Sequence, residues 1–82
     1  QLTSLKSLSL KENNISNLPQ NLFKFWRKSA ENLEELNLKS NHIQTINGID
    51  YLSNLKILQL EDNGLIEFPN GIDKLINLEK LY

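Results

Sequence analysis

The chain has 82 residues, with nine Lys and Arg against ten Asp and Glu, so its formal net charge is −1 at neutral pH. This balance gives no long-range attraction to nucleic acid, and the absence of Cys excludes disulfides, thiolate metal sites and thiol nucleophiles. No apolar run approaches the roughly 20 residues that a transmembrane helix needs, so we expect no membrane partner.

One pattern recurs along the chain. It reads "LKSLSLKENNI" from Leu5, "LEELNLKSNHI" from Leu33, "LKILQLEDNGL" from Leu55 and, truncated, "LEKLY" from Leu78. The first leucines of these units are 28, 22 and 23 residues apart, and a repeat at such a period is typical of a solenoid. We therefore predict a single repeat segment over residues 1–82, of about three and a half units and without evident end caps.

Each unit begins with a short strand. The triplets "LSL", "LNL" and "LQL" have the two-residue period of a strand with one buried face. The leucines predicted to face the core are Leu8, Leu10, Leu36, Leu38, Leu58 and Leu60. Because all units run in the same direction, we expect the strands to pair in parallel and to form one sheet.

An asparagine follows each strand where the chain turns inward. Asn13, Asn41 and Asn63 lie three residues after the last strand leucine, where the backbone loses its sheet partners. An amide side chain offers both a donor and an acceptor. We interpret these residues as a structural column that satisfies the turn, and weigh against this the hypothesis of a row of binding amides.

The residues directly after this column predict a left-handed backbone step. Asn14, His42 and Gly64 are all residue types that tolerate positive φ. This position explains the single His as a surface turn residue, since it lacks the additional ligands of a metal site.

The first unit has a longer return segment than the others. Its stretch "LFKFWRKSAENL" (22–33) places Leu22, Phe25, Trp26 and Leu33 at helical spacing, and Pro19 suits a first helical position. We predict an α-helix of about three turns, with Phe25 and Trp26 packed inward. The basic residues then face solvent. The alternative is a contact patch for a partner or a membrane, formed by Lys24, Trp26, Arg27 and Lys28.

The later units return to the sheet by shorter routes. Asn-Gly pairs at 47–48 and 70–71 mark turns, and the stretches after them have room only for single turns or 3₁₀ segments. The apolar residues predicted to continue the core are Ile15, Leu18, Ile43, Ile46, Ile49, Leu52, Leu65, Phe68, Ile72 and Leu75.

The template L-x-x-L-x-L-x-x-N-x-L, met at every fixed position in three units, resembles that of leucine-rich-repeat proteins. The resemblance implies an α/β solenoid, a right-handed coil with short parallel strands on the concave face. Turns, 3₁₀ segments and one longer helix would lie on the convex face. The 22-residue unit with its "INGI" turn looks like repeats of phosphatase-regulatory subunits and bacterial internalins, whereas "LP" and "FP" look like the typical class.

The resemblance also implies a noncatalytic module that binds a protein partner through its concave face. The candidate residues form three columns: Ser7, Glu35, Ile57 and Lys80; then Ser9, Asn37, Gln59 and Tyr82; then Lys11, Lys39 and Glu61. Ile57 and Tyr82 stand out as contact anchors. The entrance of the strands carries charges of alternating sign, which we interpret as a solubilising edge, at Lys6, Glu34, Lys56 and Glu79.

The sequence offers no constellation for catalysis. The carboxylate pairs Glu34–Glu35 and Glu61–Asp62 point in alternate directions, and no Ser has a credible base. We expect no enzyme activity, metal or cofactor, and a fragment of a longer protein whose uncapped ends allow oligomerisation. The alternative is a substrate-recruiting or autoinhibitory arm of a larger enzyme, such as a kinase or ubiquitin ligase. A small chain without Cys favours a reducing compartment, either the cytoplasm or a host cell into which the protein is secreted.

Overall fold

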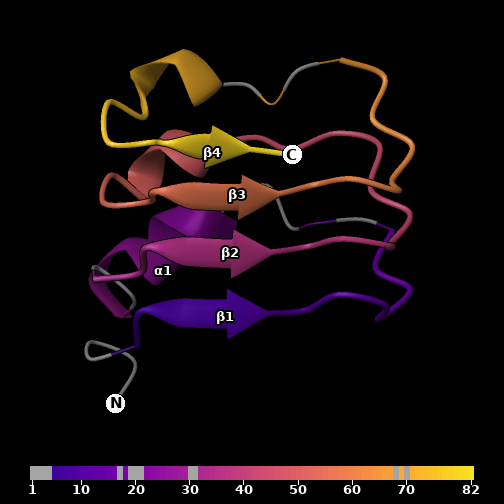
Figure 1. The fold of residues 1–82 in the computed structure, drawn as a ribbon, viewed down its shortest axis with the longest axis horizontal. Helices are drawn as coiled ribbons and strands as arrows, with labels where there is room; N and C mark the ends of the chain where they lie inside the picture. Colours follow the sequence, from indigo (N-terminus) through magenta and orange to yellow (C-terminus); the bar gives the residue numbers. More distant parts are fainter. Residues whose placement is uncertain (1–4, 17, 19–21, 30–31, 68, 70) are drawn as a thin grey trace.

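Four short strands form one parallel sheet in the order of the sequence. The fold comes from a computed structural model, which describes residues 5–16, 18, 22–29, 32–67, 69 and 71–82. The strands are β1 (Ser7–Ser9), β2 (Glu35–Asn37), β3 (Ile57–Gln59) and β4 (Lys80–Leu81). Figure 1 shows them side by side, from indigo to yellow. The predicted parallel sheet of short strands is thereby confirmed.

Equivalent residues of successive units lie directly beside one another in the sheet. Leu36 pairs with Leu8 on one side and with Leu58 on the other, and Leu58 pairs with Leu81. Side chains alternate between the two faces of a strand, so these leucines point to the same face of the sheet, although Leu81 in the last strand is 42% exposed. Leu36 and Leu58 are 0% exposed there, while Leu8 is half-buried against the core.

The return segments cover this face of the sheet. They contain α1 (Leu22–Ser29) and two 3₁₀ turns, η2 (Ile49–Tyr51) and η3 (Ile72–Lys74), and Figure 1 shows α1 behind the strands. A glycine with positive φ precedes each 3₁₀ turn, Gly48 at 79° and Gly71 at 94°. The predicted Asn-Gly turns and 3₁₀ segments are therefore confirmed for both glycines. The described part of α1 spans about two turns, and Pro19 lies outside the described residues.

One hydrophobic cluster connects the sheet to the returns. Its buried members are Phe23, Leu33, Leu36, Leu38, Ile43, Ile46, Ile49, Leu52, Leu55, Leu58, Leu60 and Leu75. Half-buried residues predicted for the core also pack against it, including Leu10, Ile15, Leu18, Leu65 and Ile72. Phe68 lies outside the described residues. Within the described part of the chain, no helix is long and apolar enough to cross a bilayer.

The predicted orientation of the aromatic residues on α1 is partly wrong. Phe25 is 74% exposed, whereas Phe23 is 2% exposed and belongs to the core. Trp26 does turn inward, and its ring packs edge-on against Phe23 with 5.5 Å between the ring centroids. The helix faces the core along Leu22, Phe23 and Trp26, which share one arc of about 100°, and Phe25 falls outside that arc.

The left-handed step was also predicted at the wrong place in two units. The residues with positive φ are Glu12, Asn14, Ser40 and Asp62. Asn14 thus fits the prediction, but His42 and Gly64 do not. The chain reverses two residues after the last strand leucine, before the column asparagine, because this reversal is what directs the asparagine inward.

The corrected position of the aromatics on α1 predicts opposite outcomes for two matched substitutions. Phe23→Leu will lower the free energy of unfolding by about 1–2 kcal/mol, since it removes buried ring atoms. Phe25→Leu will change it by less than about 0.5 kcal/mol, since that ring is exposed. Urea unfolding followed by circular dichroism measures both, and equal effects would contradict the burial of Phe23.

The glycines give a second matched pair. A Cβ at Gly71 would meet the Oδ1 atom of Asp50 at 2.5 Å in a left-handed backbone, so Gly71→Ala will destabilise the protein by about 1–2 kcal/mol. Gly64 has no positive φ and no atom within 4 Å of a Cβ. Gly64→Ala will therefore be neutral or stabilising by up to about 1 kcal/mol. Thermal unfolding of the two variants provides the comparison.

Candidate functional site

The face of the sheet opposite the core gathers the side chains that the sequence assigned to binding. We call it the outward face, and its members are Ser7, Ser9, Lys11, Glu35, Asn37, Lys39, Ile57, Gln59, Glu61, Lys80 and Tyr82. The register places Ile57 between Glu35 and Lys80 in the first column. Residues that are more than 20 positions apart in the sequence thus become neighbours.

Backbone hydrogen bonds extend this alignment beyond the strands. The amide of Glu12 donates to the carbonyl of Lys39, and the amide of Ser40 donates to the carbonyl of Glu61, both at 3.0 Å. The amide of Leu60 donates to the carbonyl of Tyr82 at 3.1 Å. These bonds carry the alignment of the units into the third column and to the end of β4.

The centre of the outward face is more enclosed than its margins. Glu35, Asn37, Ile57, Gln59 and Glu61 are half-buried. The exposed members of the face are Ser7, Ser9, Lys11, Lys39, Lys80 and Tyr82. The Asn37 Oδ1 atom accepts a hydrogen bond from the amide of Lys39 at 3.0 Å, which fixes the orientation of this amide side chain.

Glu61 has an unusual environment on this face. Its Oε1 atom is buried and has no hydrogen-bond partner among the described residues. An acceptor that is shielded from water without a donor is unfavourable by about 1–3 kcal/mol. A donor brought by another molecule would relieve that penalty, provided that the carboxylate rotates toward it.

The column asparagines connect consecutive units. The Asn41 Oδ1 atom accepts hydrogen bonds from the amides of Asn13 at 3.0 Å and Ile15 at 2.9 Å, which belong to the preceding unit. Its Nδ2 atom donates to the carbonyls of Leu10 at 3.1 Å and Leu38 at 2.9 Å. Asn41 is 4% exposed, and both ends of its side-chain amide are hydrogen-bonded to the backbone.

The next unit repeats this arrangement. The Asn63 Oδ1 atom accepts from the amide of Ile43 at 3.0 Å, and its Nδ2 atom donates to the carbonyls of Leu38 and Leu60 at 3.0 and 2.9 Å. Asn13 is exposed instead, and its Nδ2 atom donates locally to the carbonyl of Lys11 at 3.2 Å. Two of the three asparagines therefore hold neighbouring units together.

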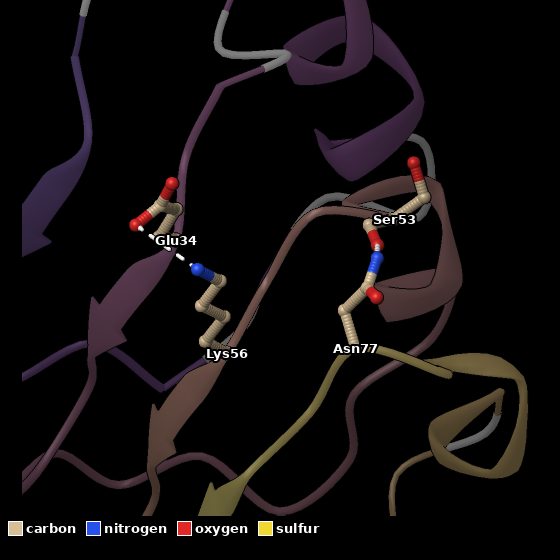
Figure 2. Close-up of polar contacts among 4 residues, drawn as sticks. All are labelled: Glu34, Ser53, Lys56 and Asn77. Atoms are coloured by element: carbon tan, nitrogen blue, oxygen red, sulfur yellow. Dashed lines mark hydrogen bonds and ion pairs between the residues drawn. The ribbon is translucent and has the colours of Figure 1, made fainter.

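The entrance of the strands carries two further contacts between units. The Lys56 Nζ and Glu34 Oε1 atoms are 3.9 Å apart, and both side chains are exposed enough that the pair contributes only a few tenths of a kcal/mol. The Asn77 Nδ2 atom donates to the carbonyl of Ser53 at 3.1 Å. Figure 2 shows both contacts on adjacent units.

The Asn77 contact has a signal in the repeat pattern of the sequence. An asparagine directly precedes the first leucine of three units, at Asn32, Asn54 and Asn77. The repeat alignment therefore had a second asparagine column, at the opposite end of the strands from Asn41.

The helix α1 lies behind the sheet, on the side opposite the outward face (Figure 1). Lys24 is exposed, whereas Trp26 is half-buried against the core. Arg27 and Lys28 lie on the same helix, but their side chains fall outside the described part of the chain. Trp26, which the alternative hypothesis assigned to a contact patch, is therefore partly in the interior, and the exposed aromatic ring of this helix is that of Phe25.

Among the hollows on the described surface, two differ clearly in character. One, of about 530 Å³, adjoins β4 and is largely apolar, with the lining residues Leu60, Leu65, Ile66, Glu67, Pro69, Leu81 and Tyr82. The other, of about 330 Å³, is polar and lies at the turns, lined by Ser40, Asn41, His42, Gln44, Asp62, Asn63 and Gly64. Among the described residues, no group of three or more His, Asp or Glu could hold a metal ion.

Comparison with known sequences identifies relatives over nearly the whole chain. A family profile described as "Leucine rich repeat" matches residues 3–65. The chain is 34% identical over its full length to the volume-regulated anion channel subunit LRRC8D of Rattus norvegicus, and 33% identical to subunit LRRC8A of Homo sapiens. It is also 37% identical, over 96% of its length, to the probable serine/threonine-protein kinase pats1 of Dictyostelium discoideum.

These relatives are much longer proteins. The chain spans 9% and 10% of the length of the two channel subunits and 2% of the length of the kinase. The similarity therefore concerns a short repeat segment, which occurs both in channel subunits and in a probable kinase.

The hydrogen bonds of the column predict unequal effects for its members. Asn41→Ala will lower the free energy of unfolding by about 3 kcal/mol, since it leaves buried amides and carbonyls unpaired. Asn13→Ala will lower it by less than about 1 kcal/mol, because it removes one exposed local bond. Urea unfolding checks both, and similar losses in the two variants would contradict a role between units for Asn41.

Proposed function

The chain belongs to the leucine-rich-repeat family, whose domains generally mediate protein–protein interaction, and on this basis we propose a noncatalytic module that binds a protein through its outward face. The observation that carries the proposal is the register of the sheet, continued by backbone hydrogen bonds beyond the strands, which aligns eleven side chains of varied chemistry on one surface. A surface held by backbone pairing loses little conformational entropy on binding.

The chemistry of the outward face favours a partner with both apolar and cationic groups. Ile57 is an apolar side chain flanked by charged neighbours, and Tyr82 is 53% exposed. Such residues are typical contact anchors. The unpartnered oxygen of Glu61 favours a donor from the partner, such as a Lys or Arg side chain.

The size of the face requires contacts beyond it. The outward face consists of four aligned segments, which include the strands and the residues just after them. With about 4.8 Å between segments and about five residues at 3.3 Å along each, it presents roughly 300 Å². A standard interface covers about 800 Å² per partner. We propose that the partner also reaches the apolar hollow beside β4, to which Tyr82 already belongs.

We also propose that the sheet is the concave side of a right-handed coil. Support comes from the sequence order of the strands and from the return segments stacked behind them, where α1 contacts η2 and η2 contacts η3. Bulk on the outer side bends such a stack toward its strands, because a helix is about 10 Å wide and paired strands are about 4.8 Å apart.

A second candidate function is a recruiting or autoinhibitory arm of a larger enzyme. The observation that favours it is the kinase named among the relatives. The sequence flanking these residues in the full-length gene tests this directly, since a catalytic domain there would favour the arm. Further repeats with no catalytic domain would favour the binding module.

Substitutions on the outward face will weaken capture of the partner. The triple variant Glu35→Arg, Ile57→Ser and Gln59→Ala will reduce recovery of partner proteins at least about tenfold in a pull-down with the full-length protein, because it removes the centre of the face. A matched control, Glu79→Arg, Ile76→Ser and Gln44→Ala, changes the same residue types at exposed positions elsewhere. Equal recovery with the two variants would refute binding through this face.

A further inference from the structure

The exposed ring of Phe25 lies in the most basic part of the chain. Phe25 is 74% exposed on α1, next to the exposed Lys24. Residues 13–30 carry three cationic residues, Lys24, Arg27 and Lys28, and no carboxylate. The remaining residues carry six cationic residues and ten carboxylates, so the positive charge is concentrated on this helix.

The two faces of α1 have different roles. Phe23 fills the core, and Trp26 packs against it. Phe25 is therefore not needed to hold the helix in place, although a fully apolar ring in water is unfavourable. The structure gives no reason within the fold for a phenylalanine at this position.

We propose that the exposed side of α1, where Phe25 and Lys24 lie, is a peripheral contact site for an anionic phospholipid surface. Lys and Arg side chains attract anionic headgroups, and an aromatic ring beside them can insert at the level of the headgroups. Trp26, half-buried at the same helix, lies close enough to report on the contact.

The shape of this site favours a lipid surface over an acidic protein. Phe25 protrudes, and a rigid protein partner would need a matching pocket to cover it, whereas a bilayer surface adapts to the ring. The 3₁₀ turns on the same side carry Asp50 in η2 and Asp73 in η3, and Lys74 follows Asp73. Those carboxylates repel anionic headgroups and therefore confine the contact to the α1 end of the molecule. Because the contact is small, the binding is weak and reversible.

Vesicle binding tests the proposal with the 82-residue chain. At low ionic strength the protein will cosediment with vesicles that contain about one third phosphatidylserine, and not with vesicles of phosphatidylcholine alone. Trp26 is the single Trp of the chain, so its fluorescence reports on α1. Brominated acyl chains in the anionic vesicles will quench its emission.

Three variants distinguish binding through this site from nonspecific adsorption to vesicles. Phe25→Ser will weaken the partition coefficient about tenfold, and Lys24→Gln about fivefold. Ile76→Ser will leave it unchanged, although Ile76 is 89% exposed, because that side chain lies outside the basic segment. The thermal midpoints will agree within about 2 °C, since all three residues are exposed.

Several outcomes would overturn the proposal. They are equal binding to both kinds of vesicle, no binding to anionic vesicles, an unchanged partition coefficient for Phe25→Ser, and a loss for Ile76→Ser as large as that for Phe25→Ser. Quenching or a shift of Trp26 emission by a polyglutamate peptide, without vesicle binding, would instead assign α1 to an acidic protein partner.

Discussion

The backbone hydrogen bonds that pair the strands residue for residue hold alternate side chains against one shared interior. Leu36 and Leu58 are fully buried because each lies between equivalent leucines of its neighbours. If the register between two neighbouring strands shifted by one residue, the leucines of one strand would face solvent and its polar side chains would face the core. The same constraint arranges the outward face, so the stability of the sheet and the composition of its binding surface have a single origin.

The periodic features of the chain could be predicted because each is fixed by a repeated local cause. The strands follow from the alternation of leucines, and the turns before η2 and η3 follow from glycines that adopt positive φ. The three columns of the outward face then follow from register alone. Their function does not, since recognition residues are free to vary from unit to unit.

The features that the sequence did not predict correctly lie where the repeat gives no guidance. On α1, Leu22 and Trp26 are compatible with two arcs of similar width, one that includes Phe23 and one that includes Phe25. Helical spacing cannot choose between them, because the choice depends on where the helix axis lies above the core. In the turns, positive φ falls on Ser40 and Asp62 although a glycine was available at Gly64. The geometry needed to turn the column asparagine inward outweighed residue preference.

The hydrogen bonds by which Asn41 and Asn63 connect units lead to the unit before their own in the sequence. Asn41 caps amides of the unit before it, and Asn63 caps an amide of the unit before its own. The turn amides of a newly made unit therefore bond to water until the asparagine of the following unit has left the ribosome. During synthesis each turn would complete its hydrogen bonds only after the next unit has been made. A pause in translation between units would therefore leave the most recent turn incomplete.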